Sequence, residues 1–286
     1  MTAVSRFAPP SPDLIRLDVE RAFAEDIGGG DATADLLPVD AQAVATLISR
    51  EQAVLAGRPW FDACFQMLDA QTQLEWCAQD GDTVAAGTVL CQLRGRARSL
   101  VTAERSALNF LQLLSGTATT TSQYAAALAG TRTRLLDTRK TLPGLRLAQK
   151  YAVRCGGGVN HRVGLYDGIL VKENHIIAAG GIGAAVAAAR ALHPALPLEV
   201  EVENLDELAQ ATAAGVDRIM LDNFDVASMR EAVRVTGGIV PLEVSGNVEL
   251  DTLRDIAATG VDFVSVGALT KHVKAIDLSL RLHIAH

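Results

Sequence analysis

The chain has 286 residues, of which 49% are apolar and 21% are charged, a composition typical of a folded globular protein and not of a disordered one. Its formal net charge of -7 argues against nucleic acid as a partner. No apolar run reaches transmembrane length, and the N-terminal residues lack the hydrophobic stretch of a secretion signal, so we expect no membrane partner. Four cysteines without CxxC spacing predict reduced thiols in a cytoplasmic protein.

The first part of the chain alternates helical and strand-like segments. The spacing of apolar residues predicts helices at 12–27, 59–68 and 102–128, and strands at 43–49 and 74–78. The run Gly28-Gly29-Gly30 ends the first helix. Thr102 is the candidate N-cap of the third helix, which we expect to be interrupted at Gly116. These segments predict an α+β sandwich domain.

After Gly130 the pattern changes to strands that alternate with helices. Strand-like segments lie at 135–138, 168–171, 198–202, 218–221, 240–244 and 263–266, and helical segments follow at 145–154, 182–192, 205–213, 226–235 and 250–258, with a short helix last. Such alternation is typical of parallel βα repeats. At least six repeats are present, fewer than the eight of a complete barrel, and they predict an incomplete or open parallel α/β barrel. No glycine-rich nucleotide-binding motif opens any repeat.

The last segment of the chain has the alternation of a strand with one buried face. Leu278, Leu280, Leu282 and Ile284 all fall on one side of it. Because this strand lies beyond the barrel repeats, we expect it to return to the N-terminal sheet. The predicted domains are therefore an α+β domain of residues 1–115, joined by the strand 277–286, and an α/β barrel domain of residues 116–276.

A cationic segment, residues 136–175, stands out in this acidic chain. Arg139 and Lys140 follow one strand-like run, Lys172 ends another, and His161-Arg162 follow a glycine loop. Cations at strand ends and beside glycines favour an anion-binding site over a solvated basic surface. Three further cations, spaced by four residues, are typical of a solvated helix face instead: Arg146, Lys150 and Arg154.

Polar residues also follow the other predicted strands, at the end where α/β barrels carry out catalysis. Arginine and lysine suit carboxylates, whereas Glu201 and Asp222 suit sugar hydroxyls or a divalent metal. Two further segments, which we expect to open helices, offer backbone N–H groups to a phosphate: Ser245-Gly246-Asn247 and Gly267-Ala268. The pattern predicts a site for a carboxylated molecule together with a sugar phosphate.

The motifs in this region resemble those of the quinolinate phosphoribosyltransferase family, the decarboxylating nicotinate-nucleotide pyrophosphorylases. In chain order they read DTRKT, NHR, ILVKENH, EVE, LDN, EVSGN and VGALTKHV. EDIGGGDAT and TAERSALNFLQLLSGTAT match the family in the first domain, so the resemblance covers nearly the whole chain. It implies a homodimeric, magnesium-requiring enzyme that joins quinolinate to 5-phosphoribosyl 1-diphosphate and releases diphosphate and carbon dioxide.

The resemblance also implies roles for individual residues. Arg105, Arg139, His161, Arg162 and Lys172 are expected to face quinolinate, with Arg105 supplied by the partner chain and Thr138 beside them. Lys140, Glu201 and Asp222 are expected to face the ribose, the diphosphate and Mg²⁺, the last two as metal ligands directly or through water. Ser245, Gly246, Asn247, Gly267 and Ala268 are expected to face the 5-phosphate. No general base is assigned: His161 is nearest in type, but a hydrogen bond to a carboxylate is an equally good role for it.

Two other functions are compatible with the same residues. Lys172 at a barrel strand end could form a Schiff base, as in an aldolase, provided that its environment keeps the amine neutral. Alternatively, the same barrel mouth could bind a carboxylate or a sugar phosphate without turnover, as a sensor. Borohydride trapping would detect the first alternative, and calorimetry without product formation would detect the second.

Overall fold

The computed structural model describes residues 7–284 and divides into two compact units. Unit 1 comprises residues 1–122, 141–157 and 269–286, and unit 2 comprises residues 123–140 and 158–268. The predicted domain boundary after residue 115 falls inside a continuous helix, α3 (Ala97–Ala127), and part of the predicted barrel, residues 141–157, belongs to unit 1.

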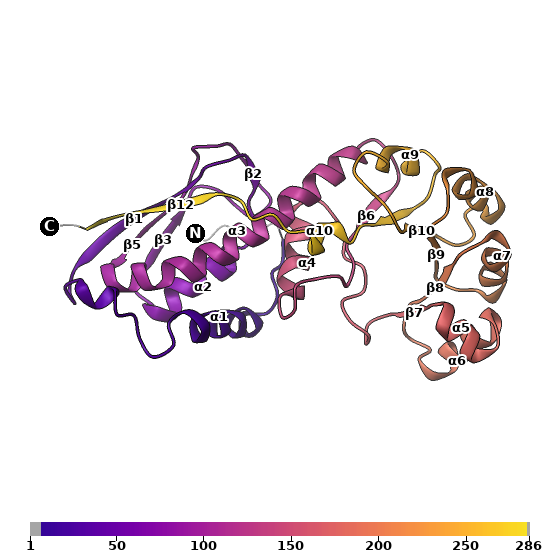
Figure 1. Cartoon of the computed structure of the whole chain (residues 1–286), viewed down its shortest axis with the longest axis horizontal. Coiled ribbons are helices and arrows are strands. Elements are labelled where there is room, and N and C mark those ends of the chain that lie inside the picture. The colour runs from indigo at the N-terminus through magenta and orange to yellow at the C-terminus, as the bar shows by residue number, and fades with distance from the viewer. Residues whose placement is uncertain (1–6, 285–286) are drawn as a thin grey trace. The chain divides into compact units, whose positions relative to one another are not determined.

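Unit 1 contains a four-stranded antiparallel sheet in the order β12-β1-β5-β3. Its strands are β1 (Gln42–Ser49), β3 (Gln73–Trp76), β5 (Val89–Arg96) and β12 (Leu278–Ile284), and a second, two-stranded sheet pairs β2 (Ala53–Val54) with β4 (Thr83–Val84). β12, the strand expected to return to the N-terminal sheet, pairs antiparallel with residues 43–49 of β1 (Figure 1). Leu278, Leu280 and Leu282 pack against the core, as their alternation predicted.

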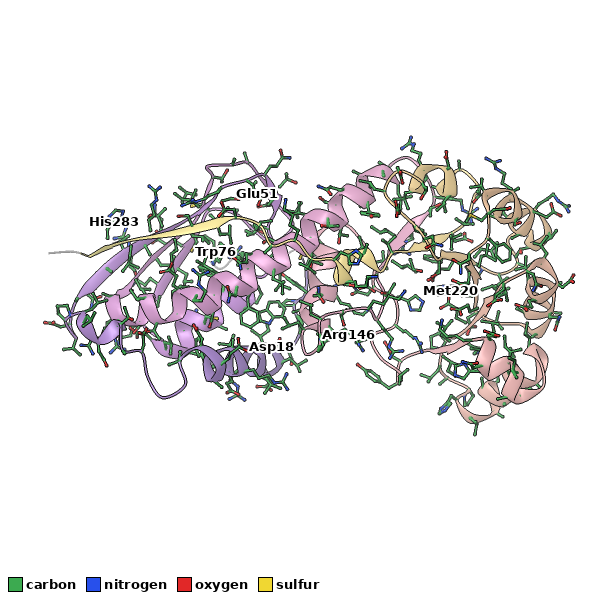
Figure 2. All side chains as sticks on the ribbon, viewed as in Figure 1. Asp18, Glu51, Trp76, Arg146, Met220 and His283 are labelled. Atoms are coloured by element: carbon green, nitrogen blue, oxygen red, sulfur yellow. The ribbon has the colours of Figure 1, made fainter. Side chains whose placement is uncertain are left out.

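Three helices accompany this sheet: α1 (Pro12–Asp26), α2 (Arg58–Leu68) and α3, with a 3-10 turn at Ala34–Leu36. Trp60, Phe61 and Phe65 of α2 are fully buried, because the apolar residues of this helix recur on one face. The indole of Trp60 donates a hydrogen bond of 2.9 Å to Asp18, whose position on α1 is labelled in Figure 2. Unit 1 therefore has an aromatic and aliphatic core with polar groups satisfied at its edge.

Helix α3 differs from its prediction at two points. It begins at Ala97, so Thr102 lies inside the helix, and its hydroxyl donates to Asp31 instead of capping. Gly116 does not interrupt the helix. A Cβ at position 116 would lie 2.1 Å from the carbonyl oxygen of Lys274, so glycine permits a close backbone contact there. The prediction of a helix break at Gly116 was wrong, because this glycine allows the Lys274 backbone to pack closely against a continuous helix.

Helix α4 (Arg146–Cys155) corrects the prediction of a solvated basic face. Lys150 is only 2% exposed, and Arg146 donates a hydrogen bond to the hydroxyl of Thr141. Arg154 donates to the carbonyl of Ala8 and stacks near the ring of Tyr151. The aliphatic stems of these side chains allow them to pack into unit 1 while their charged ends find polar partners.

Unit 2 is built on a six-stranded parallel sheet in the order β6-β11-β10-β9-β8-β7, which confirms the open α/β barrel. Its strands are β6 (Arg134–Leu136), β7 (Ile169–Val171), β8 (Leu198–Val202), β9 (Arg218–Asp222), β10 (Leu242–Ser245) and β11 (Phe263–Ser265). Helices α6 (Ile182–Leu192), α7 (Leu205–Ala214), α8 (Val226–Thr236) and α9 (Leu253–Ala257) lie on the outer side of the strands (Figure 1).

Two shorter helices complete the described chain. α5 (Glu173–Ala179), which the sequence analysis missed, begins directly after Lys172, and α10 (Ala268–Lys271) follows β11. All four cysteines are free, although Cys77 is exposed and not packed. Among the described residues no single helix is long and apolar enough to cross a membrane, and α5 with α6 meets that test only as a pair bent by 91°.

Candidate active site

The predicted site residues of unit 2 lie where its parallel strands end. Thr138, Arg139 and Lys140 follow β6, and Lys172 follows β7. The other strand ends carry Glu201 on β8, Asp222 on β9, Ser245 on β10, and Gly267 and Ala268 after β11. Because neighbouring parallel strands end at the same edge of a sheet, these groups face one region, and Asp222 is paired in register with Ser245.

Charges of both signs meet at this edge. The ammonium of Lys172, which is predicted to face quinolinate, donates a hydrogen bond to the carboxylate of Glu201, which is predicted to face the ribose. The two predicted sets of binding residues are therefore in contact. Burial raises the pKa of Asp222, the charge on Glu201 raises it further, and Lys172 and Lys140 partly oppose both effects. A divalent cation beside Asp222 would offset the unfavourable effect of the Glu201 charge on it.

The loop that carries His161 and Arg162 is fixed by two acids, the buried Asp137 and the partly buried Asp167. Asp137 is 0% exposed and accepts hydrogen bonds from the backbone N–H of His161 (2.8 Å) and the amide of Asn160 (2.6 Å). Asp167 accepts from the backbone N–H groups of Val163 and Gly164, at 2.7 and 2.8 Å. Hydrogen bonds to Asp137 therefore hold this loop beside the end of β6, close in sequence to Arg139 and Lys140.

Three of the predicted cations line one cavity of about 920 Å³ in unit 2, together with His175 and apolar side chains of β7 and α6. These are Arg139, Arg162 and Lys172. Burial lowers the pKa of Arg162 and the charge on Arg139 lowers it further, while Glu199 and Asp167 partly oppose both effects. A dianion of the size of a small aromatic ring fits both the volume and the charge of this cavity.

His175 supports the backbone at Lys172. Its Nδ1 accepts a hydrogen bond of 3.0 Å from the backbone N–H of Lys172, at the start of α5. The first turn of this helix thus fixes the backbone from which Lys172 projects.

The predicted phosphate segments are close-packed loops, but only one of them opens a helix directly. Asn223 (φ 55°) and Asn247 (φ 48°) both have left-handed backbones, and a Cβ at Gly246 would lie 2.3 Å from the Asn223 amide oxygen. Residues 245–247 do not begin a helix, because α9 starts at Leu253. Gly267 directly precedes α10, and a Cβ there would lie 3.0 Å from the Lys140 side chain.

Arg105 is the one predicted site residue outside unit 2. It lies on the exposed side of α3, in unit 1. Burial raises the pKa of the neighbouring Glu104, and the Arg105 guanidinium opposes that shift. Arg105 is therefore positioned on an open surface of its own unit.

Beneath the strand ends lies a buried charged cluster that the sequence analysis missed. The Nε2 atom of His161 lies 2.9 Å from Glu199 and 3.5 Å from Glu243, and Arg218 donates a hydrogen bond of 2.8 Å to Glu243. Burial raises the pKa of Glu243 to about 7, with the charge on Glu199 as the next cause. Strand alternation was the available signal, because Glu199 lies two residues before Glu201, and Arg218 four residues before Asp222.

Comparison with known proteins gives a consistent result. Residues 31–115 match the family model of the quinolinate phosphoribosyl transferase N-terminal domain, and residues 117–281 match that of the C-terminal domain. A probable nicotinate-nucleotide pyrophosphorylase (carboxylating) of Synechocystis is 43% identical over 95% of this chain and 94% of that protein. One of Bacillus subtilis is 40% identical over 92% of each chain.

Solved structures agree with the sequence relatives. The nicotinate-nucleotide pyrophosphorylase from Francisella tularensis superposes with a TM-score of 0.92 at 48% identity, covering 98% of this chain and 100% of that one. Both the family models and these relatives extend over the two units described above. The chain belongs to the quinolinate phosphoribosyltransferase family.

Proposed function

We propose that this chain transfers the phosphoribosyl group of 5-phosphoribosyl 1-diphosphate to quinolinate, with decarboxylation, and so makes nicotinate mononucleotide for NAD biosynthesis. The observation that carries the proposal is the cavity where Arg139, Arg162 and Lys172 converge, with Glu201 in contact with Lys172. Cations suit a dicarboxylate, and acidic groups suit a ribose with its metal. Family membership supports the same reaction.

The three cations of the cavity are proposed to hold quinolinate through its two carboxylates. Quinolinate is a dianion, and several fixed cations offset the cost of removing it from water. Lys172 is less suited to Schiff-base chemistry, because its ion pair with Glu201 stabilises the charged ammonium, whereas that nucleophile must be neutral. We therefore do not extend the proposal to an aldolase.

The other half of the site is proposed to bind the phosphoribosyl donor. Lys140, Glu201 and Asp222 would face the ribose and diphosphate, and the loops at 245–247 and 267–268 would face the 5-phosphate. Glu201 and Asp222 offer the carboxylate oxygens that Mg²⁺ prefers, and a cation beside Asp222 would offset the unfavourable effect of the Glu201 charge on it. Magnesium bound there would neutralise charge on the leaving diphosphate.

The protein's own contribution is to orient and to stabilise charge. As diphosphate leaves, the C1 carbon of the ribose becomes oxocarbenium-like and the quinolinate nitrogen bonds to it, while Lys140 stabilises the departing oxygens. Once the nitrogen carries the ribose, the ring is cationic and accepts the electron pair released when the C2 carboxylate leaves as carbon dioxide. The C2 position then takes up a proton.

The proposal includes a homodimer in which Arg105 serves the partner's site, as the family resemblance implies. In a two-fold dimer such an exchange is reciprocal, and the exposed position of Arg105 on α3 is compatible with it. We also propose a cytoplasmic enzyme without nucleic-acid or membrane partners, in keeping with four free cysteines and a net charge of -7.

Substrate choice tests the proposal. Nicotinate lacks the C2 carboxylate, so its binding would leave a buried cation without a partner, and we expect its kcat/KM to be lower than that of quinolinate by at least about a hundredfold. Purified protein would be assayed with each pyridine, the donor and magnesium. Comparable kcat/KM values for the two would contradict the dicarboxylate assignment.

A further inference from the structure

The cluster of His161, Glu199, Glu243 and Arg218 is not used by the reaction described above. All four residues belong to unit 2, and Glu199 and Glu243 are 6% and 0% exposed. The cluster lies deeper along the strands than Glu201 and Asp222, because Glu199 and Arg218 are at the amino ends of β8 and β9. It therefore underlies the active site without being part of its surface.

The two nitrogens of His161 have distinct partners. Nδ1 accepts a hydrogen bond of 2.7 Å from the backbone N–H of Arg162, so this nitrogen carries no proton. The proton of the neutral ring is then on Nε2, which lies 2.9 Å from Glu199 in a close electrostatic contact without hydrogen-bond geometry. The imidazole connects the buried acids on one side to the backbone of Arg162 on the other.

Arg162 is held at its other end as well. Its guanidinium donates a hydrogen bond of 2.9 Å to the carbonyl of Gly168, and the same guanidinium lines the cavity with Arg139 and Lys172. Glu243 is fixed by Arg218, which in turn lies 4.3 Å from the centre of the Phe263 ring. A continuous chain of contacts thus runs from the barrel interior to one cation of the proposed quinolinate site.

A metal centre is the competing interpretation of this cluster. Nε2 of His161 and one carboxylate oxygen from each glutamate lie within 4.8 Å of one another. A smaller cavity of about 180 Å³, lined by His161, Glu199 and Arg218 among others, reaches the cluster. A metal ligand, however, donates its other ring N–H to a partner, whereas Nδ1 here accepts. Arg218 also places a positive charge where a cation would bind.

We propose that Glu199, Glu243 and Arg218 are positioning residues, which hold His161 as the Nε2–H tautomer and thereby fix Arg162 for the quinolinate carboxylates. This inference rests on the proposed function, and it assigns His161 a role beneath the substrate instead of against it. The interaction most directly responsible is the contact between Nε2–H and Glu199.

Two isosteric substitutions test the proposal. Glu199→Leu removes the oxygen that faces Nε2–H, so we expect the KM for quinolinate to rise by at least about tenfold. Glu199→Gln keeps an acceptor oxygen and should stay within about threefold of wild type, while the KM for the phosphoribosyl donor changes by less than about twofold in both. Equal changes in the two KM values, or no rescue by glutamine, would overturn the proposal.

A control separates positioning from a general loss of stability. Asp80 in unit 1 is 4% exposed and accepts a hydrogen bond of 2.6 Å from Tyr151, so Asp80→Asn also alters a buried carboxylate. It should change the thermal midpoint and leave the KM for quinolinate unchanged. A rise in that KM equal to the rise in Glu199→Leu would count against a specific role of Glu199.

Nitrogen NMR of wild-type protein labelled at its six histidines decides the tautomer without any activity measurement. The His161 signals, assigned with His161→Gln, should show a protonated Nε2 and an unprotonated Nδ1, unchanged by added Zn²⁺. The opposite tautomer, or loss of the Nε2 proton on adding Zn²⁺, would overturn the proposal in favour of the metal centre. Absence of turnover by wild type would instead refute the proposed function and leave this result standing.

Discussion

The interiors of the two units differ in what they bury. Unit 1 encloses an apolar core in which Trp60, Phe61 and Phe65 are completely buried. The buried charged residues of unit 1, Asp69, Asp80 and Lys150, lie outside its strands, whereas the barrel strands of unit 2 carry the buried Glu199 and Glu243 with Arg218 beside them. Burying charges costs free energy unless they are paired, so a charged interior is not explained by stability alone. We infer that unit 2 retains the charges of Glu199, Glu243 and Arg218 because its active site requires them.

The buried acids also differ in their surroundings. In unit 1 two acids accept from neutral aromatic donors, Asp80 from Tyr151 at 2.6 Å and Asp62 from Trp76 at 2.8 Å, and the buried Asp69 is paired with Arg96. In unit 2, Glu243 is paired with the charged Arg218. The hydrogen bond from Arg96 lowers the pKa of Asp69, whereas burial and the charge on Glu199 raise the pKa of Glu243 to about 7 despite Arg218. We therefore expect substitutions of the charged strand residues of unit 2 to change kinetics, and substitutions of Asp62 or Asp80 in unit 1 to change stability.

The largest effect is expected from Lys172→Ala. Without Lys172 the cavity lacks one of the cations proposed to bind the carboxylates of quinolinate, and Glu201 loses its ion-pair partner. The kcat/KM for quinolinate should therefore fall by about a hundredfold or more. The matched control is Arg234→Ala, which removes an exposed cation paired with Glu231 on α8 and should leave kcat/KM unchanged. Steady-state assays of both variants make the comparison, and a similar loss in the two would show that charge number matters more than position.

A smaller effect separates the two halves of the site. Asp222→Ala should raise the KM for the phosphoribosyl donor by about tenfold and leave the Kd of quinolinate within about threefold, because Asp222 lies with the donor group. Glu201→Ala is less clean, since it also removes the partner of Lys172. Calorimetric titration of quinolinate into each variant measures the partition. If Asp222→Ala abolished quinolinate binding as fully as Lys172→Ala, the partition would be wrong.

The position of Arg105 in unit 1 allows a test of the shared site. Arg105→Ala and Lys172→Ala should each be inactive, but co-expression gives mixed dimers in half of the molecules, each with one intact site. About a quarter of full activity should then return in the unfractionated mixture, and about half in mixed dimers purified through differently tagged chains. Activity no higher than that of the parents would mean that Arg105 acts within its own chain or not at all.

The smallest effect concerns stability and belongs to unit 1. Burial raises the pKa of Asp62 to about 6 from 3.8, so the folded protein binds more protons than the unfolded chain between these values. Stability should therefore fall as pH rises from about 3.8 to about 6, by up to about 3 kcal/mol, and this group should cause no further change with pH above that range.

Asp62→Asn should remove this pH dependence, because an amide oxygen can still accept from Trp76 but does not titrate. Urea unfolding at pH 4 to 8 measures the slope, with Asp13→Asn as an exposed control that keeps the wild-type profile. An unchanged slope in Asp62→Asn would assign the pH dependence to another acid.

Much of this fold was predictable because the spacing of apolar residues along the sequence indicates helices and strands locally. The limits of β8 and α6 agree with the predicted 198–202 and 182–192, since each has an uninterrupted apolar pattern. The errors arose where tertiary contacts decide: Lys150 is buried despite its charge, and Gly116 serves a neighbouring backbone. Helix α5 was missed because it is only seven residues long.

The site was predictable only at its surface. Arg139, Lys172, Glu201 and Asp222 stand at strand ends, where sequence order alone marks them as candidates. Glu199 and Glu243 lie within strands, and a buried glutamate is an exception that no local pattern requires. The contact of His161 with Glu199 joins residues 38 positions apart, so it depends on how β8 packs against the loop before β7.

The most direct test of the whole account is a product assay. Purified protein would be incubated with quinolinate labelled in its C2 carboxylate, 5-phosphoribosyl 1-diphosphate and magnesium, with Lys172→Ala as the control. Nicotinate mononucleotide, diphosphate and labelled carbon dioxide should form in equal amounts with wild type only. Quinolinate binding without any of these products would contradict the account and would favour a sensor instead of an enzyme.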